Sequence, residues 1–284
     1  MMPAVFFGHG SPMNALESNR YTEAWRLFGA SVPRPRAILA ISAHWHINAT
    51  AVTAMARPRT IHDFYGFPQR LFEVDYPAPG DPSLAAEVAD VAQPTHIGQD
   101  HDSWGIDHGT WSVLVHAFSK ADIPVVQLSI NAAKEFGFHL ELGARLAPLR
   151  ERGVLIMGSG NVVHNLHAVD WSAADTGFDW AQRFDAAARD VLTRRPRETA
   201  ALHGHLDFEL AAPTPEHFIP LLYIAGLASA ANDTLTPLVE GCAFGSISMA
   251  SYSLGTGRPT QVADGGPSAG MPAPDVASAD EANI

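Results

Sequence analysis

Histidines follow short apolar runs at places where parallel strands would end. His9 comes after the run 4–7, between two glycines, and His44 comes after the run 37–42. In open α/β sheets the ligand crevice lies just beyond the carboxyl ends of the strands. Imidazole is a common ligand of zinc, iron and copper. We therefore expect His9 and His44 to face one crevice and hold a metal ion, although a sharp turn alone would also explain the two glycines.

Two further histidines are expected at the same edge of the sheet. His164 follows the run 154–158 and a glycine-rich turn, and His217 closes the stretch Thr214-Pro215-Glu216-His217. That stretch predicts a helix start, with a capping threonine and a proline at the first helical position. The positive end of the helix dipole would keep His217 neutral and able to bind metal. The glycine-rich turn could instead cradle a phosphate, but it lacks the P-loop lysine and the dinucleotide fingerprint.

A fifth histidine, His108, lies among tryptophans and glycines in the stretch Trp104-Gly105-Ile106-Asp107-His108-Gly109-Thr110-Trp111. An aromatic wall with one titratable group suits a flat phenolic substrate. We therefore expect His108 to transfer protons, with a packed aromatic loop and a surface histidine as the alternative. His62 is a weaker candidate for the same pocket.

Short apolar runs alternate with helix-compatible segments, which is typical of an α/β fold with a mostly parallel sheet. We predict one domain, residues 1–255, with a mixed, mostly parallel central sheet flanked by helices. The predicted strands are 4–7, 37–42, 124–130 and 154–158, and the predicted helices include 82–91, 138–151, 180–193 and 215–228. Residues 256–284 are rich in Gly, Pro, Ala, Ser and Asp, and we expect them to form a flexible tail.

The composition excludes several classes of protein. A net charge of −12, with only 18 Lys and Arg scattered along the chain, argues against a nucleic-acid surface. The apolar stretch 218–231 contains a proline and is shorter than the roughly 20 residues that cross a bilayer, so no membrane partner is expected. One cysteine, Cys242, excludes a disulfide framework within the chain, and the N-terminus has no basic start of a signal peptide. We therefore expect a cytoplasmic protein of unknown oligomeric state.

The motifs form an ordered set that spans the chain from Pro3 to about Leu254. The set consists of Gly8-His9-Gly10-Ser11-Pro12-Met13, Ser42-Ala43-His44-Trp45, Trp104-Gly105-Ile106-Asp107-His108-Gly109, Gly158-Ser159-Gly160-Asn161-Val162-Val163-His164-Asn165 and Pro213-Thr214-Pro215-Glu216-His217-Phe218. It resembles the class III extradiol ring-cleavage dioxygenases, specifically the DOPA 4,5-dioxygenase branch.

The resemblance implies a mononuclear divalent metal and the insertion of both atoms of O2 into a catechol-type aromatic diol. It implies that His9, His44 and His217 are metal ligands. In related enzymes the residue that matches His164 is either a metal ligand or an acid/base group. We place His164 on the metal and expect His108 to be the catalytic proton carrier. Fe(II) is the metal expected for oxygen chemistry, while Zn(II) suits the same ligands but cannot pass electrons to O2.

Two other functions remain open from the residues alone. A zinc-dependent hydrolase would use the metal to activate water, with His108 or Glu216 moving protons, although no His-Glu-x-x-His helix is present and neither Ser11 nor Ser159 lies in a Gly-x-Ser-x-Gly elbow. A protein that only binds metal would have a closed ligand shell, whereas a catalytic site keeps an open position beside a substrate pocket.

Overall fold

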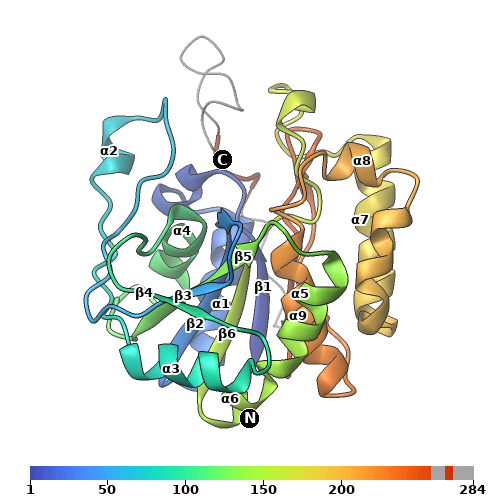
Figure 1. The fold of residues 1–284 in the computed structure, drawn as a ribbon. Helices are drawn as coiled ribbons and strands as arrows, with labels where there is room; N and C mark the ends of the chain where they lie inside the picture. Colours follow the sequence, from blue (N-terminus) through green and yellow to red (C-terminus); the bar gives the residue numbers. More distant parts are fainter. Residues whose placement is uncertain (257–265, 271–284) are drawn as a thin grey trace.

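The computed structural model of this chain describes residues 1–256 and 266–270, and an eight-stranded sheet runs through it (Figure 1). The strands of the sheet are β1 (Ala4–Gly8), β2 (Ala37–Ile47), β3 (Ala51–Thr53), β4 (Gly98–Asp100), β5 (Val125–Asn131), β6 (Val154–Gly160), β7 (Thr236–Val239) and β10 (Ser251–Leu254). Their order is β4-β3-β5-β2-β6-β1-β10-β7. The four central strands β5, β2, β6 and β1 are parallel, whereas β3, β10 and β7 introduce antiparallel pairs. The predicted α/β class with a mostly parallel centre is confirmed.

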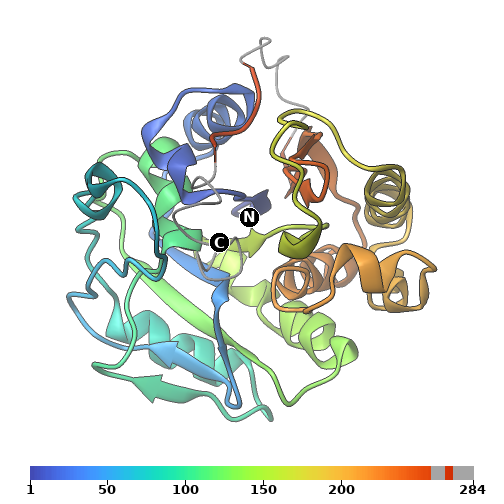
Figure 2. The same ribbon diagram turned by 90° about the horizontal axis from the view of Figure 1, so that it is seen from above.

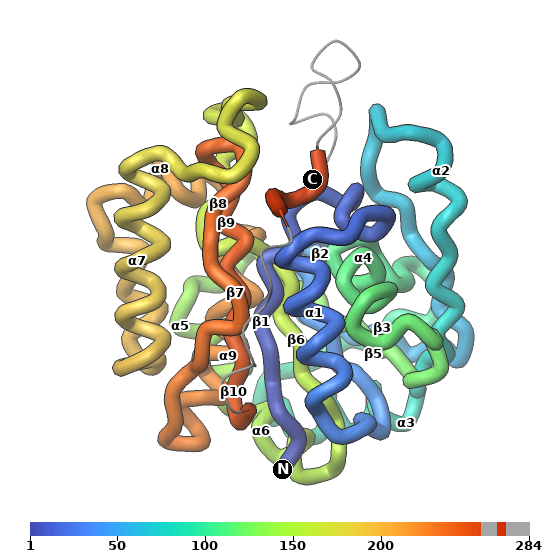
Figure 3. Tube along the Cα trace, turned by 180° about the vertical axis from the view of Figure 1, so that it is seen from behind, coloured from blue at the N-terminus to red at the C-terminus, as the bar shows by residue number. Residues whose placement is uncertain are grey.

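Helices cover both faces of the sheet. The α-helices are α1 (Arg20–Ser31), α2 (Gln69–Phe72), α3 (Pro82–Val91), α4 (His108–Ala117), α5 (Phe136–Arg145), α6 (Ala147–Glu151), α7 (Asp179–Arg194), α8 (Phe208–Ala211) and α9 (Ile219–Ala230). Short 3₁₀ helices are η1 (Pro12–Leu16), η2 (Leu166–Ala168) and η3 (Pro196–Gly204), and β8 (Cys242–Ala243) pairs with β9 (Ile247–Ser248). Seen from behind, α1 and α4 cross the near face of the sheet, while α5 and α9 lie beyond it (Figure 3).

The side chains of the central strands explain these layers. In β1, Ala4 and Phe6 belong to the apolar core beneath α5 and α9, whereas Val5 and Phe7 belong to the core beneath α1 and α4. Successive residues of a strand point to opposite faces, so a strand that is apolar at every position must be covered on both sides. The same burial on both faces holds for β5 and β6.

Three predicted elements differ from the structure by a break or by more than two residues at an end, and two of these differences lie at prolines. The predicted helix 138–151 is divided at Leu146 into α5 and α6, because Pro148, in the first turn of α6, cannot donate a helical hydrogen bond. The predicted helix 215–228 begins at Ile219, so Thr214 is not its cap. The third difference is that β2 continues to Ile47 and contains His44.

Helix α9 is buried along almost its whole length, as the apolar stretch predicts. Among the residues that the structure describes, no helix is long and apolar enough to span a membrane.

Most of the tail predicted to be flexible, residues 257–265 and 271–284, lies outside the described residues. The short described segment 266–270 lies beside η1 near the N-terminal part of the chain (Figure 2). The backbone N–H of Ala269 donates to Oδ1 of Asn14 at 2.9 Å, and the Ser11 hydroxyl donates to the carbonyl of Gly270 at 2.9 Å. This part of the tail therefore has defined contacts with the domain.

Candidate metal centre

The sheet brings His9 and His44 to one edge by different means. His9 is the first residue after β1, and its backbone N–H donates to the carbonyl of Gly160 at the end of β6 (3.1 Å). His44 lies in a bulge of β2, where the four residues between Ile41 and His46 face the single residue of β5 between Leu128 and Ile130. Bulges re-aim side chains, and this one directs His44 toward His9.

His217 reaches the same point because a glycine leaves room for its backbone. The backbone N–H of Asn161 donates to the carbonyl of His217 at 2.9 Å. A Cβ atom on Gly160 would lie 2.1 Å from that carbonyl oxygen. Any other residue at position 160 would push away the turn that carries His217, so the glycine-rich stretch serves close backbone packing.

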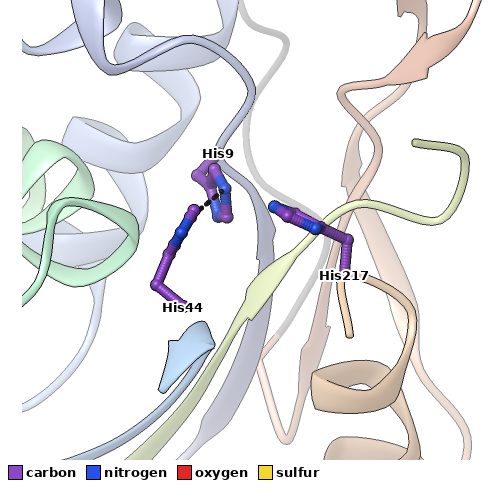
Figure 4. Close-up of side chains that lie close together, drawn as sticks. All are labelled: His9, His44 and His217. Carbon is purple, nitrogen blue, oxygen red and sulfur yellow. Dashed lines mark hydrogen bonds between the residues drawn. The ribbon is translucent and has the colours of Figure 1, made fainter. Parts of the chain in front are cut away.

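The three histidines direct their rings toward one another (Figure 4). Nε2 of His9 lies 3.3 Å from Nε2 of His44, and one ring nitrogen from each of His9, His44 and His217 falls within a group no wider than 4.8 Å. All three side chains are buried. Three converging nitrogen donors in one buried place are the arrangement that a transition metal or zinc requires.

Hydrogen bonding fixes the tautomer of His9. The Ser159 hydroxyl donates its single hydrogen to the carbonyl of Gly109. Its oxygen must therefore accept from Nδ1 of His9, which lies 2.9 Å away. The proton of His9 then sits on Nδ1, and Nε2 presents a lone pair toward His44.

A carboxylate oxygen also lies beside Nδ1 of each of the other two rings. Oδ2 of Asp63 lies 3.4 Å from Nδ1 of His44, and Oε1 of Glu216 lies 3.1 Å from Nδ1 of His217. Nε2 of His217 is buried and has no hydrogen-bond partner among the described residues. In metal-binding histidines the outer nitrogen, which faces away from the metal, contacts an oxygen, and the inner nitrogen, which faces the metal, has no other partner. The residues of this cluster therefore fit a metal.

The three imidazoles are neutral in this environment. Burial, followed by the neighbouring imidazole of His44, holds the pKa of His9 well below its usual value. Burial and then His108 lower the pKa of His44 to about 3, and burial and then His164 lower the pKa of His217. Burial is thus the main cause for His217, in place of the helix dipole expected from the sequence. Neutral imidazoles keep the lone pairs that a metal needs.

His164 lies beside His217. The two rings are stacked, with centroids 3.5 Å apart and planes 9° from parallel. His164, Glu216 and His217 form a second group of donor atoms within 4.8 Å of one another. The structure thus brings His164 next to the three-histidine cluster, through His217.

His108 is the first residue of α4 and is buried, which differs from the alternative of a packed loop with a surface histidine. Its ring is buried, with its centroid 3.9 Å from that of His44. Oδ1 of Asp63 lies 3.0 Å from its Nδ1 and accepts a hydrogen bond from its backbone N–H at 3.0 Å. Neither ring nitrogen of His108 has a well-aligned hydrogen-bond partner among the described residues, so Nδ1 and Asp63 are in ion-pair contact. Burial acts to raise the pKa of Asp63, but the facing His108 and His44 hold it below its usual value.

A cavity of about 370 Å³ opens onto this cluster. Its described lining consists of Ala43, His44, His46, His164, Leu166, His167, Pro213, Thr214, Glu216 and His217. The volume is within the range of small-molecule sites. Histidines, one carboxylate and a few apolar side chains thus form the space beside the metal ligands.

The expected aromatic wall is not part of this lining. Trp104 stacks on Trp45 with centroids 5.7 Å apart, and Trp111 donates from Nε1 to the carbonyl of Ile61. His62, the weaker candidate, faces the carbonyl of Val74 at 2.8 Å and is absent from the described lining. These aromatic residues support the loops around His108 and do not line this cavity.

Two polar residues that the sequence did not single out complete the centre. Asp63 contacts both His44 and His108, and Ser159 fixes His9. Ser159 lies inside a motif that was considered for phosphate, and Asp63 directly follows His62 in the sequence. Only the fold shows that their oxygens meet histidines distant in the chain.

Comparisons with known proteins agree with this geometry. Residues 8–251 match the family described as the catalytic LigB subunit of aromatic ring-opening dioxygenase. The chain is similar to the 4,5-DOPA dioxygenase extradiol of Escherichia coli (strain K12), with 47% identity over 258 residues, 89% of this chain and 95% of that protein. It is 37% identical to the 4,5-DOPA dioxygenase extradiol of Beta vulgaris over 234 residues, 78% of this chain and 85% of that protein. The solved structure of an uncharacterized protein from Escherichia coli K12 is similar with a TM-score of 0.79 and 41% identity, covering 90% of this chain and 100% of that one.

Proposed function

Because this chain belongs to the LigB family of aromatic ring-opening dioxygenases, we propose that its histidine cluster is the metal site of an extradiol dioxygenase. The enzyme is an oxidoreductase that cleaves the ring of a DOPA-like catechol with O2. The observation that carries the site assignment is the convergence of the inner nitrogens of His9, His44 and His217. Family membership decides against the hydrolase alternative.

We assign the metal to His9, His44 and His217, with His164 as the fourth ligand beside His217. LigB dioxygenases depend on a metal, and for oxygen chemistry we propose Fe(II), which when bound supplies the electrons that activate O2. The chain's own contribution is orientation: Ser159, Asp63 and Glu216 hold the outer nitrogens, so the inner nitrogens stay aimed inward.

We assign proton transfer to His108. A proton on its Nδ1 faces Oδ1 of Asp63, which leaves the lone pair of Nε2 free to accept a proton from a catechol hydroxyl. The charge of Asp63 stabilises the imidazolium that forms, and His108 can return the proton as the ring opens. Its ring lies against His44, so the accepted proton stays beside the metal ligands.

The proposed partners are a small aromatic diol and O2, and the proposed location is the cytoplasm, in keeping with the single cysteine.

The test is metal removal followed by reconstitution with Fe(II) or Zn(II), with oxygen uptake measured on L-DOPA and simpler catechols. Iron-loaded protein should consume O2 and give a ring-opened product, and zinc-loaded protein should not, because zinc cannot donate electrons. Iron-loaded protein that consumes no O2 with any catechol would refute the dioxygenase assignment.

A further inference from the structure

The start of α4 positions two groups of the site in succession. His108, to which proton transfer is assigned, is the first residue of the helix. The carbonyl of the next residue, Gly109, accepts the hydrogen of the Ser159 hydroxyl, which in turn fixes Nδ1 of His9. A Cβ atom on Gly109 would lie only 2.7 Å from Cδ2 of His44. The helix start is therefore packed directly against the histidine cluster, and a shift of its backbone would change the site.

The residue before His108, Asp107, fixes the backbone of this helix start. It is the N-cap of α4, and its Oδ1 accepts from the backbone N–H of Thr110 at 3.1 Å. Its Oδ2 accepts from Nε2 of Gln127 at 2.7 Å and from the indole N–H of Trp104 at 3.3 Å. An N-cap satisfies free N–H groups of its own helix. Asp107 does this and also ties the helix to β5, the strand that carries Gln127.

Gln127 binds Asp107 through both ends of its amide. Its Oε1 accepts from the backbone N–H of Asp107 at 2.9 Å, and its Nε2 donates to the Asp107 carboxylate. The backbone N–H of Gln127 donates to the Thr53 hydroxyl of β3 at 2.9 Å, and Gln127 pairs with Ala40 of β2 in the sheet. One acceptor and one donor in a planar amide fix both the position and the orientation of the group that they hold. Asp107 is thereby attached to the centre of the sheet.

A polar residue is unusual at this place in β5. Successive residues of a strand point to opposite faces, so Gln127 shares with Val125 the face that α1 and α4 cover. The side chain of Gln127 is fully buried, where an apolar residue would pack without any need for hydrogen bonds. The buried amide therefore has a use that packing does not explain, namely its two hydrogen bonds to Asp107.

We infer that Gln127, acting through Asp107, is a positioning residue for proton transfer by His108. The inference rests on the proposed function, because it concerns the role assigned to His108. Neither Gln127 nor Asp107 is among the described residues that line the cavity, so both act through the backbone that carries the His108 ring. Catalytic geometry is sensitive to small shifts, and a displacement of about 1 Å can cost on the order of 100-fold in rate.

Gln127→Met tests the inference, because it keeps the length of the side chain and removes both bonds to Asp107. In the iron-loaded, full-length protein kcat should fall about 10-fold while KM changes by less than about twofold, since Gln127 does not line the cavity. Bound metal should be unchanged. Ser129→Ala is the matched control, because Ser129 is buried in the same strand and its hydroxyl also makes two hydrogen bonds, with Ala49 and Ala51. This control should keep its kcat.

A second pair of changes exchanges the donor and the acceptor. Asp107→Asn leaves one oxygen, which cannot accept from both Thr110 and Gln127, so kcat should fall by a similar factor. Adding Gln127→Glu places a carboxylate opposite the new amide, whose Nδ2 can donate to one carboxylate oxygen while the other oxygen accepts the backbone N–H of position 107. The double variant should recover most of the lost kcat, which a general loss of core packing would not allow.

Hydrogen exchange measures the helix start without turnover. The backbone N–H groups of Thr110 and Trp111 both donate to Asp107. In Gln127→Met these two groups should exchange about 10-fold faster than in the unaltered chain, the effect of losing roughly one to two net hydrogen bonds. In Ser129→Ala they should exchange at the unaltered rate.

A Gln127→Met variant with the kcat of Ser129→Ala would overturn the inference. Unchanged exchange at Thr110 and Trp111 would also overturn it, as would a double variant no more active than Asp107→Asn. Failure of the unaltered, iron-loaded chain to consume O2 with any catechol refutes the proposed function. An unaltered chain that is active beside an equally active Gln127→Met variant refutes the positioning role alone.

Discussion

Oδ1 of Asp63 lies 3.0 Å from Nδ1 of His108. Its second oxygen, Oδ2, lies 3.4 Å from Nδ1 of His44. One carboxylate therefore orients both a metal ligand and the proposed proton carrier. The negative charge of Asp63 also favours a proton on the ring of His44 or of His108. The charge at the metal ligand His44 is therefore coupled to proton transfer by His108.

Asp63→Asn should lower kcat about 10- to 100-fold, the usual effect of losing a carboxylate behind a functional histidine. The side chain keeps its size, but the negative charge that stabilises a proton on His108 is lost. Oxygen uptake and bound metal are measured together on the purified variant. Asp75→Asn is the control, because Asp75 is exposed and bonds only to the Thr60 hydroxyl among the described residues. Equal activity in the two variants would remove Asp63 from the mechanism.

His108→Ala should retain metal and lose ring opening by roughly 100-fold or more, the usual contribution of a general base. The three inner nitrogens of the metal group come from His9, His44 and His217, so the loss of His108 leaves the ligands in place. Metal analysis and product formation are compared with the unaltered chain. Full activity would reassign the base.

His164→Ala should lower the metal content if His164 is a ligand, as proposed. The variant is compared with His9→Ala, which removes a residue of the three-histidine group, and with His203→Ala, which removes an exposed imidazole. Metal content near that of the His203 variant, together with lost turnover, would move His164 to an acid/base role.

The site histidines could be predicted because their positions follow from local patterns. An apolar run followed by His9 places that residue at a strand end, and parallel central strands bring such ends to one edge. The bulge that turns His44 inward leaves no local signal, because it depends on how β2 pairs with β5.

Asp63 shows the limit of local patterns more clearly. Nothing in its neighbourhood marks it, because its role depends on contacts with His44 and His108, 19 and 45 residues away. The tryptophans near His108 show the opposite error. Their pattern suggested that they line the substrate pocket, but tertiary packing buries Trp111 in the core.

Truncation after Gly255 should leave ring cleavage intact. The described contacts of 266–270 reach Asn14 and Ser11, and Asn14 also donates to the carbonyl of His9 at 3.0 Å and accepts from Asn19. The retained contacts should hold Asn14, so we expect a loss of stability of about 1 kcal/mol, close to that of one or two net hydrogen bonds. Thermal unfolding and oxygen uptake test this, and a folded but inactive truncation would show that the segment is part of the site.

Asp185→Asn should stabilise the protein near pH 7.5 and have less effect as the pH falls toward 4. Burial raises the pKa of Asp185 in α7 to about 6, against an ordinary value of 3.8, and its Oδ1 accepts from the Ser248 hydroxyl. Below pH 3.8 the carboxyl is protonated in both folded and unfolded chains, and the native state loses stability as the pH rises through 6. An amide avoids that loss while keeping an acceptor for Ser248, so the gain at pH 7.5 is at most about 3 kcal/mol. Urea unfolding at several pH values measures it, with Asp179→Asn, at an exposed position of the same helix, as control. A gain that does not change with pH would show that Asp185 is not held in its protonated form.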